Sequence, residues 1–498
     1  MWTPPAKIKH PLPQVTWPTM EQSQAALLFQ PLRYQALQLQ QRTWVPAMVP
    51  WRAHPQGYVS EDVMRWYQRF AQGQPGAIVI EATGVRDIES GPLLRIGHDR
   101  FIPGLSQLTQ AMRQSSQGKT LNLVQLIDFL PIRRRPSSDK FFAKYLPVNQ
   151  SIRMHLSEKS GDVFWLTLSE SDVRTRLAQA HDEIWQKLLP ARLYRDLSYG
   201  YREEINDMHI PAIRDLPQQL PPLFTQAALR AQQAGFDGIE LHFAHAYTLA
   251  SFLSRSNMRD DGYGGSREQR VRLPLEVYQA VRASVGDDFI VGCRFLGEDV
   301  IQGGSTLEDT REYALAFAQA GFDFLSLSKG GRFEDAAQPK VGAAAYPYTG
   351  PSGYECMPTV YSDQQGPFGR NVYLSQDIRS YIRQNGFHTP VVIAGGIQNF
   401  EQAESILQSQ QADIIAAARQ SLADPDWFLK MHLGLGEQIR RCQYTNYCEA
   451  LDARHKQVTC RLWDRTLLDA DDAFLSHDKR RRLEAPQSQL PSMLPSDI

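Results

Sequence analysis

The sequence predicts an α/β protein built on a (β/α)8 TIM barrel, with long insertions after strands three and six and a C-terminal extension. The 498 residues, 42% of them hydrophobic, are ample for a large core. Short segments rich in Val, Ile and Leu alternate with longer helical patterns through most of the chain. These segments are continuously apolar, as strands buried on both faces of a parallel sheet should be. A doubly wound open sheet is the competing architecture.

Eight segments have the composition of buried parallel strands. In chain order they are Thr43–Met48, Ala77–Glu81, Leu121–Ile127, Gly238–His242, Phe289–Arg294, Phe324–Ser328, Val391–Ala394 and Asp413–Ala417. Eight such strands close a barrel whose functional site lies at their carboxyl ends.

Helical patterns separate most of these strands. The expected helices are Ser60–Gln72, Pro222–Ala234, Ser266–Val285, Leu307–Ala320 and Asn399–Gln408. The third helix is the best delimited, because Ser266 is expected as its N-cap, Gln269 completes a capping box and Gly286 marks its end.

The rest of the chain defines the predicted domain organisation. Two long segments leave the barrel at the end where loops carry function. The tail ends in Pro, Ser and Gln after a basic run, which predicts disorder. The predicted units are an N-terminal extension (1–30), the barrel (31–435, with an insertion at 131–221 and a loop at 329–376), a cysteine-containing extension (436–475) and a largely disordered tail (476–498).

Composition narrows the classes of function. The net charge of -1 gives no global field that would recruit nucleic acid or an anionic membrane. No apolar run is long enough to span a bilayer, and the first residues lack the apolar region of a secretory signal. Five cysteines are too few for a disulfide framework in a chain of this length. We expect a cytoplasmic protein that acts on a small molecule, with its oligomeric state left open.

The most informative segment runs from Gly238 to Tyr247. It is predicted to form an apolar strand whose end brings His242, His245 and Tyr247 close together. Two imidazoles and a phenol can donate hydrogen bonds to a carbonyl oxygen and supply a proton. An isolated pair of histidines at a strand end is more often a pair of satisfied core residues.

The residues around this segment carry a resemblance. Residues 234–247 read AGFDGIELHFAHAY, and YGGS at 263–266 leads to Arg270. They resemble the motifs AGFDGVEIHxAHGYL and RxDxYGGSxExR of the Old Yellow Enzyme family (NADH:flavin oxidoreductases), particularly its 2,4-dienoyl-CoA-reductase-like branch. The resemblance runs from about Pro31 to Cys460, and that family is also a (β/α)8 barrel. It implies that His242 and His245 bind the substrate's carbonyl oxygen above FMN, and that Tyr247 protonates the adjacent carbon.

The first two strands resemble flavin-binding segments of the family. Residues 43–48 are similar to the first strand, NRxVMAPM, which implies that Ala47 and Met48 lie against the flavin ring. Val49 stands where relatives often carry Thr or Cys near flavin O4, and it cannot donate a hydrogen bond. Ala82, in the E-A-T of strand two, is expected to contact the flavin.

Two polar residues are implied at the flavin's pyrimidine edge. Gln125 matches the family's Q-L, and its amide can both donate and accept. Relatives continue H-x-G-R, whereas this chain has IDFL at 127–130, so the loop is expected to be remodelled. Arg294 is expected near flavin N1 and O2, where a cation stabilises the anionic reduced flavin. A structural salt bridge is the alternative for Arg294.

Two turns after strands seven and eight resemble the family's phosphate-binding turns. Gly395 and Gly396 allow backbone N–H groups to approach an oxyanion. The guanidinium of Arg419 adds two charged N–H donors. Ala418 replaces the usual Gly; it keeps the N–H, so binding should survive unless a positive φ is needed.

The C-terminal cysteines depart from the family pattern. Cys442, Cys448 and Cys460 resemble the C-x2-C-x2-C-x11-C run of the cluster-bearing branch, but Thr445 holds the second ligand position. A [4Fe–4S] cluster needs four thiolates, so a degenerate site without a cluster is favoured. A cluster completed by another ligand is the alternative. The FAD and NAD(P)H domain of larger relatives is expected to be absent.

The resemblance implies an FMN-dependent NAD(P)H oxidoreductase. Hydride would pass from NAD(P)H through flavin N5 to an activated alkene, either an α,β-unsaturated carbonyl or an enoyl thioester, with Tyr247 as the proton donor. The alternatives are a flavin-dependent dehydrogenase or demethylase on the same barrel, and a non-catalytic flavin-binding relative. The substrate and the choice between NADH and NADPH stay open.

Overall fold

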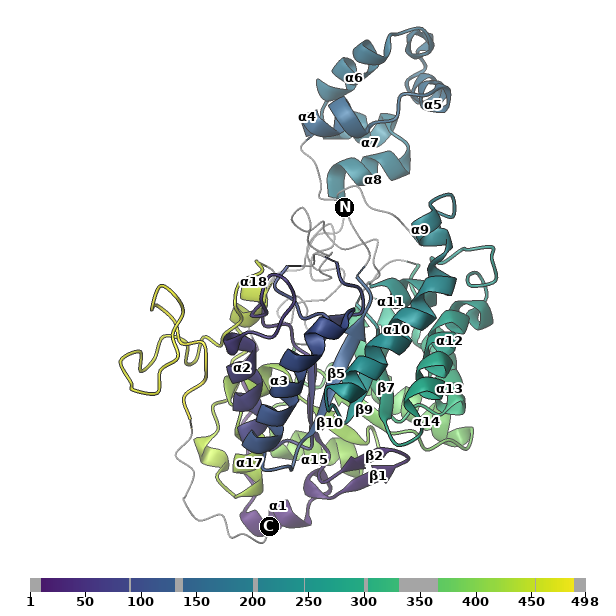
Figure 1. Ribbon diagram of the computed structural model, residues 1–498. Helices are drawn as coiled ribbons and strands as arrows, with labels where there is room; N and C mark the ends of the chain where they lie inside the picture. Colours follow the sequence, from purple (N-terminus) through teal and green to yellow (C-terminus); the bar gives the residue numbers. More distant parts are fainter. Residues whose placement is uncertain are drawn as a thin grey trace.

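A closed barrel of eight parallel strands forms the centre of the molecule (Figure 1). The computed structural model describes residues 10–88, 91–129, 138–199, 205–245, 247–299, 303–330, 366–452 and 454–487. The strand order around the barrel is β10-β3-β4-β5-β6-β7-β8-β9, so neighbours in space are neighbours in sequence apart from the closure. The predicted (β/α)8 barrel is confirmed, and the open doubly wound sheet is excluded.

The eight barrel strands correspond to the eight predicted segments. They are β3 (Thr43–Val45), β4 (Ala77–Gly84), β5 (Leu121–Ile127), β6 (Gly238–Phe243), β7 (Ile290–Asp299), β8 (Leu325–Gly330), β9 (Val391–Ala394) and β10 (Ile414–Ala416). β3 stops before Pro46, which has no N–H to continue the ladder. β7 runs past Arg294 because it stays paired with β8 as far as Asp299 and Gly330.

Helices surround the barrel on its outer face (Figure 1). They are α2 (Glu61–Gln72), α3 (Ile102–Ser115), α10 (Leu216–Gln233), α12 (Arg267–Val285), α13 (Leu307–Ala320), α14 (Val372–Gln384) and α15 (Phe400–Gln408). α12 begins as predicted, since Ser266 Oγ accepts a hydrogen bond from the Gln269 N–H, and Gly286 ends it with a φ of 78°. α10 starts earlier than expected and contains Pro221 and Pro222 within it. The sequence analysis missed α3 and α14.

The amino ends of the strands are sealed by apolar side chains. A short hairpin of β1 (Leu32–Tyr34) and β2 (Leu37–Leu39) places Leu37 and Leu39 in a buried cluster with Trp44, Phe324 and other strand residues. α1 (Met20–Ala25) packs on α17 (Trp427–His432), where Ser23 donates to the carbonyl of Met431. Within the described ranges, the carboxyl ends of the strands are therefore the end of the barrel left for a site.

The segment after β5 forms a helical cluster with a core of its own. Figure 1 shows it standing away from the barrel at one end. Its elements are α4 (Ser138–Lys140), a π-helical turn (Phe141–Tyr145), α5 (Gln150–Ser160), a 3-10 turn (Val163–Leu166), α6 (Glu170–Ala178), α7 (Asp182–Leu188) and α8 (Ala191–Tyr199), followed by α9 (Pro211–Arg214) nearer the barrel. Phe141, Leu156 and Leu177 are fully or almost fully buried in this cluster. Residues 131–137 of the predicted insertion and 331–365 of the predicted loop lie outside the described residues.

The C-terminal segment returns to the barrel surface. Arg482 is buried, its backbone N–H donates to Asp464 O, and its guanidinium donates to Leu467 O at 2.8 Å. The prediction of disorder from residue 476 is therefore wrong for residues 476–487, because part of the basic run is used to bind backbone carbonyls. Residues 488–498 lie outside the described residues. No helix in the described ranges combines the length and hydropathy that a bilayer crossing requires.

A buried ion pair joins α2 to the start of α17, and the same arginine bonds the C-terminal segment. Arg69 donates to both carboxylate oxygens of Asp426 at 2.6 Å and to the carbonyl of Ala485 at 3.0 Å. Replacing Asp426 with Ala would leave Arg69 buried without its counter-ion, so we expect the free energy of unfolding to fall by about 3–5 kcal/mol. Glu61→Ala breaks the exposed Arg65–Glu61 pair and should cost less than about 1 kcal/mol. Urea unfolding of both variants checks this; equal losses would contradict it.

Candidate active site

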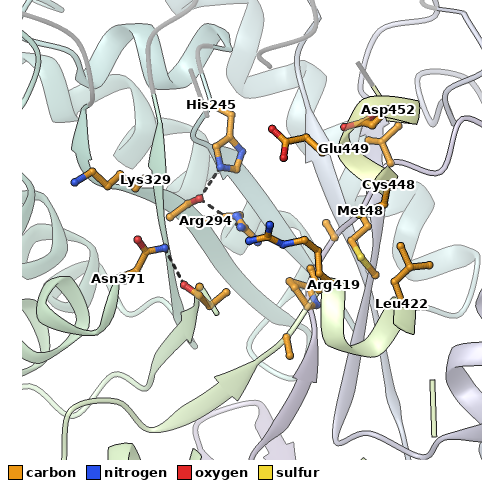
Figure 2. A pocket seen from close by; sticks show the side chains of 18 of the residues that line it. Met48, His245, Arg294, Lys329, Asn371, Arg419, Leu422, Cys448, Glu449 and Asp452 are labelled. Carbon is orange, nitrogen blue, oxygen red and sulfur yellow. Dashed lines mark hydrogen bonds between the residues drawn. The ribbon is translucent and has the colours of Figure 1, made fainter. Parts of the chain in front are cut away.

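A cavity of about 270 Å³ opens at the carboxyl ends of the barrel strands (Figure 2). Its lining includes all of the catalytic and flavin-binding positions predicted from the sequence. These are Ala47, Met48, Ala82, Gln125, His242, His245, Tyr247, Arg294, Gly395, Gly396, Ala418 and Arg419. Their chemical roles stay predictions, but the barrel does bring them to one place.

His242 lies at the end of β6 and is almost fully buried. Its Nδ1 accepts a hydrogen bond from the backbone N–H of Ala244 at 3.1 Å. Burial, and then the charge of Arg294, lower the pKa of His242 to about 3. The ring is therefore neutral near pH 7. With Nδ1 as the acceptor, the single ring proton is on Nε2, which is left as a donor.

His245 follows in a strained turn. Its φ is 57°, in the left-handed region that non-glycine residues rarely adopt. Burial, then the charges of Arg294 and His242, hold the pKa of His245 well below its usual value. The two imidazole centroids are 5.2 Å apart, and the rings are almost perpendicular. This backbone conformation costs stability, and it fixes the direction in which the His245 side chain points.

Tyr247 completes the group from the N-cap of α11 (Thr248–Leu253). It is buried, and its ring lies 5.4 Å from that of His242 and packs edge-on against Phe129, also at 5.4 Å. Asp128 Oδ2 accepts from the Thr248 hydroxyl at 2.6 Å, while its Oδ1 accepts from Arg86 Nε. In the sequence, residues 127–130 depart from the family pattern. In the structure, Asp128 of this loop bonds the first residue of α11 and so supports the position of Tyr247.

Arg294 projects from β7 into the cavity with unused donors. Its Nη2 donates to Ser328 Oγ at 3.4 Å. Its Nε and Nη1 are buried and have no partner among the described residues. A buried guanidinium with unpaired donors is costly unless a ligand supplies acceptors. An electron-rich heterocycle edge, such as flavin N1 and O2, is a ligand of that kind, so this residue fits the implied FMN.

Gln125 is oriented by a residue that the sequence analysis missed. Its Nε2 donates to Oε2 of Glu240 at 2.5 Å, inside the barrel. Glu240 is fully buried on β6; burial raises its pKa, opposed by the charge of Arg294. This bond uses one of the two N–H groups of the Gln125 amide, so its second N–H and its oxygen are left for a ligand, and the oxygen can accept from a donor such as flavin N3–H. A carboxylate in the middle of an apolar strand is the signal that could have identified Glu240.

The turns after β9 and β10 form the opposite part of the cavity. Gly395 and Gly396 have φ of 136° and 71°, and a Cβ on Gly396 would lie 1.5 Å from Pro367 O, so glycine is required there. Asn371 Nδ2 holds this turn by donating to Ala394 O at 2.9 Å. Ala418 has a φ of -82°, so its replacement of the family's glycine introduces no strain.

Arg419 lies where the second turn meets the C-terminal extension. Its Nη1 donates to Asn446 Oδ1 at 3.0 Å, and its guanidinium lies over the ring of Tyr444 at 5.0 Å. Helix α18 (Tyr447–Asp452) of the same extension adds Cys448, Glu449 and Asp452 to the cavity wall. Figure 2 shows these side chains across the cavity from Lys329 and Asn371.

The three C-terminal cysteines line a second, smaller cavity next to the first. Cys448 contributes to both cavities. Burial raises the pKa of Cys448 and Cys460 to about 12 and also raises that of Cys442, so all three remain thiols near pH 7. In the described part of the chain, no group of three or more His, Cys, Asp or Glu side chains is arranged to hold a metal ion. Three thiols and a threonine do not fit the four thiolates of a [4Fe–4S] cluster.

The depressed pKa of His242 predicts how stability depends on pH. The unfolded chain binds the histidine proton below about pH 6.5, whereas the folded chain binds it only near pH 3. Between these values the unfolded state holds more protons, so stability should fall as the pH falls from 6.5 toward 3. His242→Gln should show a shallower loss in urea unfolding at about pH 7, 5 and 4. Identical pH dependence in the two proteins would contradict the assignment.

Comparisons with known proteins show which family part of the chain resembles. Residues 213–438 match the model of the NADH:flavin oxidoreductase / NADH oxidase family. The chain is similar to an NADH oxidase of Thermoanaerobacter brockii, 36% identical over 220 residues that make up 44% of this chain and 30% of that protein. It is also similar to an NADPH dehydrogenase of Listeria welshimeri, 30% identical over 253 residues, which are 51% of this chain and 64% of that protein. The chain thus covers less than two thirds of either relative.

A solved structure shows the same fold over more of the chain. The old yellow enzyme homologue from Zymomonas mobilis matches with a TM-score of 0.50 at 23% identity, covering 81% of this chain and 91% of that one. Residues 213–438 are therefore similar to the NADH:flavin oxidoreductase / NADH oxidase family, and the solved structure shows that the chain shares its barrel fold.

Proposed function

We propose that the protein is an FMN-dependent oxidoreductase that uses NAD(P)H to reduce an activated alkene, an α,β-unsaturated carbonyl or an enoyl thioester. The observation that carries this proposal is the group of three donors, His242, His245 and Tyr247, in the same cavity as the Arg294 donors that have no partner in the described part of the chain. FMN, when bound, supplies the hydride transfer between the nicotinamide and the substrate.

Residues from several strands would hold FMN in this cavity. Arg294 and Gln125 suit its pyrimidine edge, where one offers N–H donors and the other a carbonyl acceptor. The glycine turn at 395–396 and Arg419 suit its phosphate, because a backbone N–H and a guanidinium both bind oxyanions. Ala47, Met48 and Ala82 supply apolar surface for the ring system.

The two histidines would bind the substrate through its carbonyl oxygen. Both rings are neutral, so each has one N–H to donate. Two neutral donors polarise a carbonyl and stabilise the negative charge that develops on its oxygen when hydride reaches the β-carbon. No counter-ion has to be buried with the substrate, because neither imidazole carries a charge.

Tyr247 would supply the proton. Its phenol shares the cavity with the histidines, and Phe129 and α11 hold the ring in place. A phenol is neutral near pH 7 and can deliver its proton to the α-carbon once negative charge has developed there. The tyrosine and the histidines thus act on neighbouring atoms of one substrate.

An absorption spectrum of the purified protein tests the proposal. We expect about one FMN per chain, loss of the yellow colour on anaerobic addition of NADH or NADPH, and its return when cyclohex-2-enone is added. A protein that can bind no flavin would refute the proposal. A flavin that an amine reduces, and that no enone reoxidises, would show that the same site works in the dehydrogenase direction.

A further inference from the structure

Ser328 links the two sides of the candidate site. It lies on β8, lines the cavity and is 5% exposed. Its Oγ is 2.6 Å from Nε2 of His245 and 3.4 Å from Nη2 of Arg294. Figure 2 shows the two hydrogen bonds running from His245 and from Arg294 to the side chain between them. The three residues come from consecutive strand units of the barrel, and no sequence motif singled out Ser328.

The chemistry of the three groups sets the direction of these hydrogen bonds. A guanidinium has no acceptor, so Arg294 donates and Ser328 Oγ accepts. The serine hydroxyl then has one hydrogen of its own to donate. The serine oxygen has two lone pairs and could also accept from a His245 Nε2–H, but its own hydrogen would then have no acceptor among the described residues, so we assign His245 Nε2 as the acceptor.

We propose that Ser328 is a positioning residue that fixes the tautomer of His245, with Nε2 as the acceptor and the ring proton on Nδ1. His242 has the opposite arrangement, since its Nδ1 accepts from the Ala244 N–H and its proton is on Nε2. The neighbouring imidazoles therefore carry their N–H on different ring nitrogens, in rings inclined by 81°. Two donors in nearly perpendicular planes can reach one oxygen without competing for the same lone pair.

The tautomer matters for the proposed function, on which this consequence rests. A neutral imidazole has one N–H and one lone pair. If the Nδ1 of His245 carried the lone pair, it would face a substrate oxygen as a second acceptor, and a hydrogen bond would become a repulsion. Ser328 thereby decides whether His245 is a donor, although the serine itself need not touch the substrate. Arg294 supports this by occupying the other side of the serine hydroxyl.

Nuclear magnetic resonance of the full-length protein with nitrogen-15-labelled histidine tests the tautomer directly. We expect one neutral ring with its proton on Nδ1, assigned to His245 by its loss in His245→Gln. Ser328→Ala should convert that ring to a tautomer mixture or to the Nε2–H form. Ser328→Thr keeps a hydroxyl and should restore the Nδ1–H form. Ser375→Ala, which removes a buried hydroxyl on α14 that bonds Val372 O, should leave the signal unchanged. A wild-type His245 with its proton on Nε2, or a Ser328→Ala signal like that of wild type, would overturn the proposal.

A kinetic measurement tests the consequence separately. In Ser328→Ala, KM for cyclohex-2-enone should rise about tenfold, the loss of one typical hydrogen bond, while kcat changes less. Ser328→Thr should recover most of this loss, and an unchanged KM in Ser328→Ala would overturn the consequence. If the protein binds no flavin, the proposed function fails, but the tautomer measurement still decides the role of Ser328.

Discussion

Replacing Tyr247 with Phe should lower kcat for the reduction of cyclohex-2-enone by about 10²–10⁴-fold, the usual contribution of a positioned general acid. The variant removes one oxygen atom and keeps the ring that packs against Phe129. The histidines and their hydrogen bonds are untouched, so substrate binding should change much less than turnover. Steady-state kinetics, with the dissociation constant for the enone measured in parallel, separates the two effects.

Tyr263→Phe is the matched control for this experiment. That phenol bonds to Glu276 at 3.1 Å, on the outer helix α12, and does not line the cavity. The control removes the same atom from another part-buried tyrosine and should leave kcat unchanged. Equal kcat in Tyr247→Phe and wild type would show that the proton comes from another group or from water.

Replacing Arg294 with Met should weaken FMN binding by about 10²–10⁴-fold, because it removes two charge-assisted hydrogen bonds worth about 1.5–3 kcal/mol each. The expected loss follows from the two buried guanidinium nitrogens that have no protein partner in the described residues. Methionine retains much of the packing volume, which separates lost hydrogen bonds from a collapsed cavity. Quenching of FMN fluorescence on titration with the flavin-free protein measures the affinity.

Two further variants make the arginine experiment specific. Arg294→Lys retains the charge but loses the planar fork, so its affinity should lie between those of wild type and Arg294→Met. Arg65→Met removes a half-exposed guanidinium from α2 and should leave FMN affinity unchanged. An unchanged affinity in Arg294→Met would mean that Arg294 is only structural, the alternative left open by its sequence context.

The barrel could be predicted because its strands carry a local signal. A strand buried on both faces needs apolar side chains at successive positions, as in Val391–Ala394, whose bounds were predicted without error. Helix α12 could also be predicted, because Ser266 caps its start and Gly286 ends it, and both roles depend on local sequence. Helix α14 was missed because it begins inside a Gly-, Pro- and Tyr-rich segment that favoured a loop. The disorder predicted from residue 476 failed because the contacts of Arg482 are not local.

Several residues that shape the candidate site could not be predicted in this way. Glu240 pairs with Gln125 and Ser328 with His245 across gaps of 115 and 83 residues. Such pairs depend on strand register, for example the alignment of Arg294 with His242 and with Ser326 on either side. A single strand contains no information about which residue of the next strand will stand beside it.

The sequence by itself determined the kind of protein and the side chains available to its site. Short, continuously apolar segments specify the strands of the barrel. The segment from Gly238 to Tyr247 places two imidazoles and a phenol at a strand end, because side-chain spacing along a strand is a local property. Only the tertiary structure decided what those groups can do. Closure of the barrel puts Arg294 and Ser328 beside the histidines and leaves two guanidinium nitrogens without a partner among the described residues. It also removes the imidazoles of His242 and His245 from water far enough to lower the pKa of both, so that they stay neutral. Burial, charge and hydrogen-bond direction arise from contacts between distant strands, and these exist only once the chain has folded.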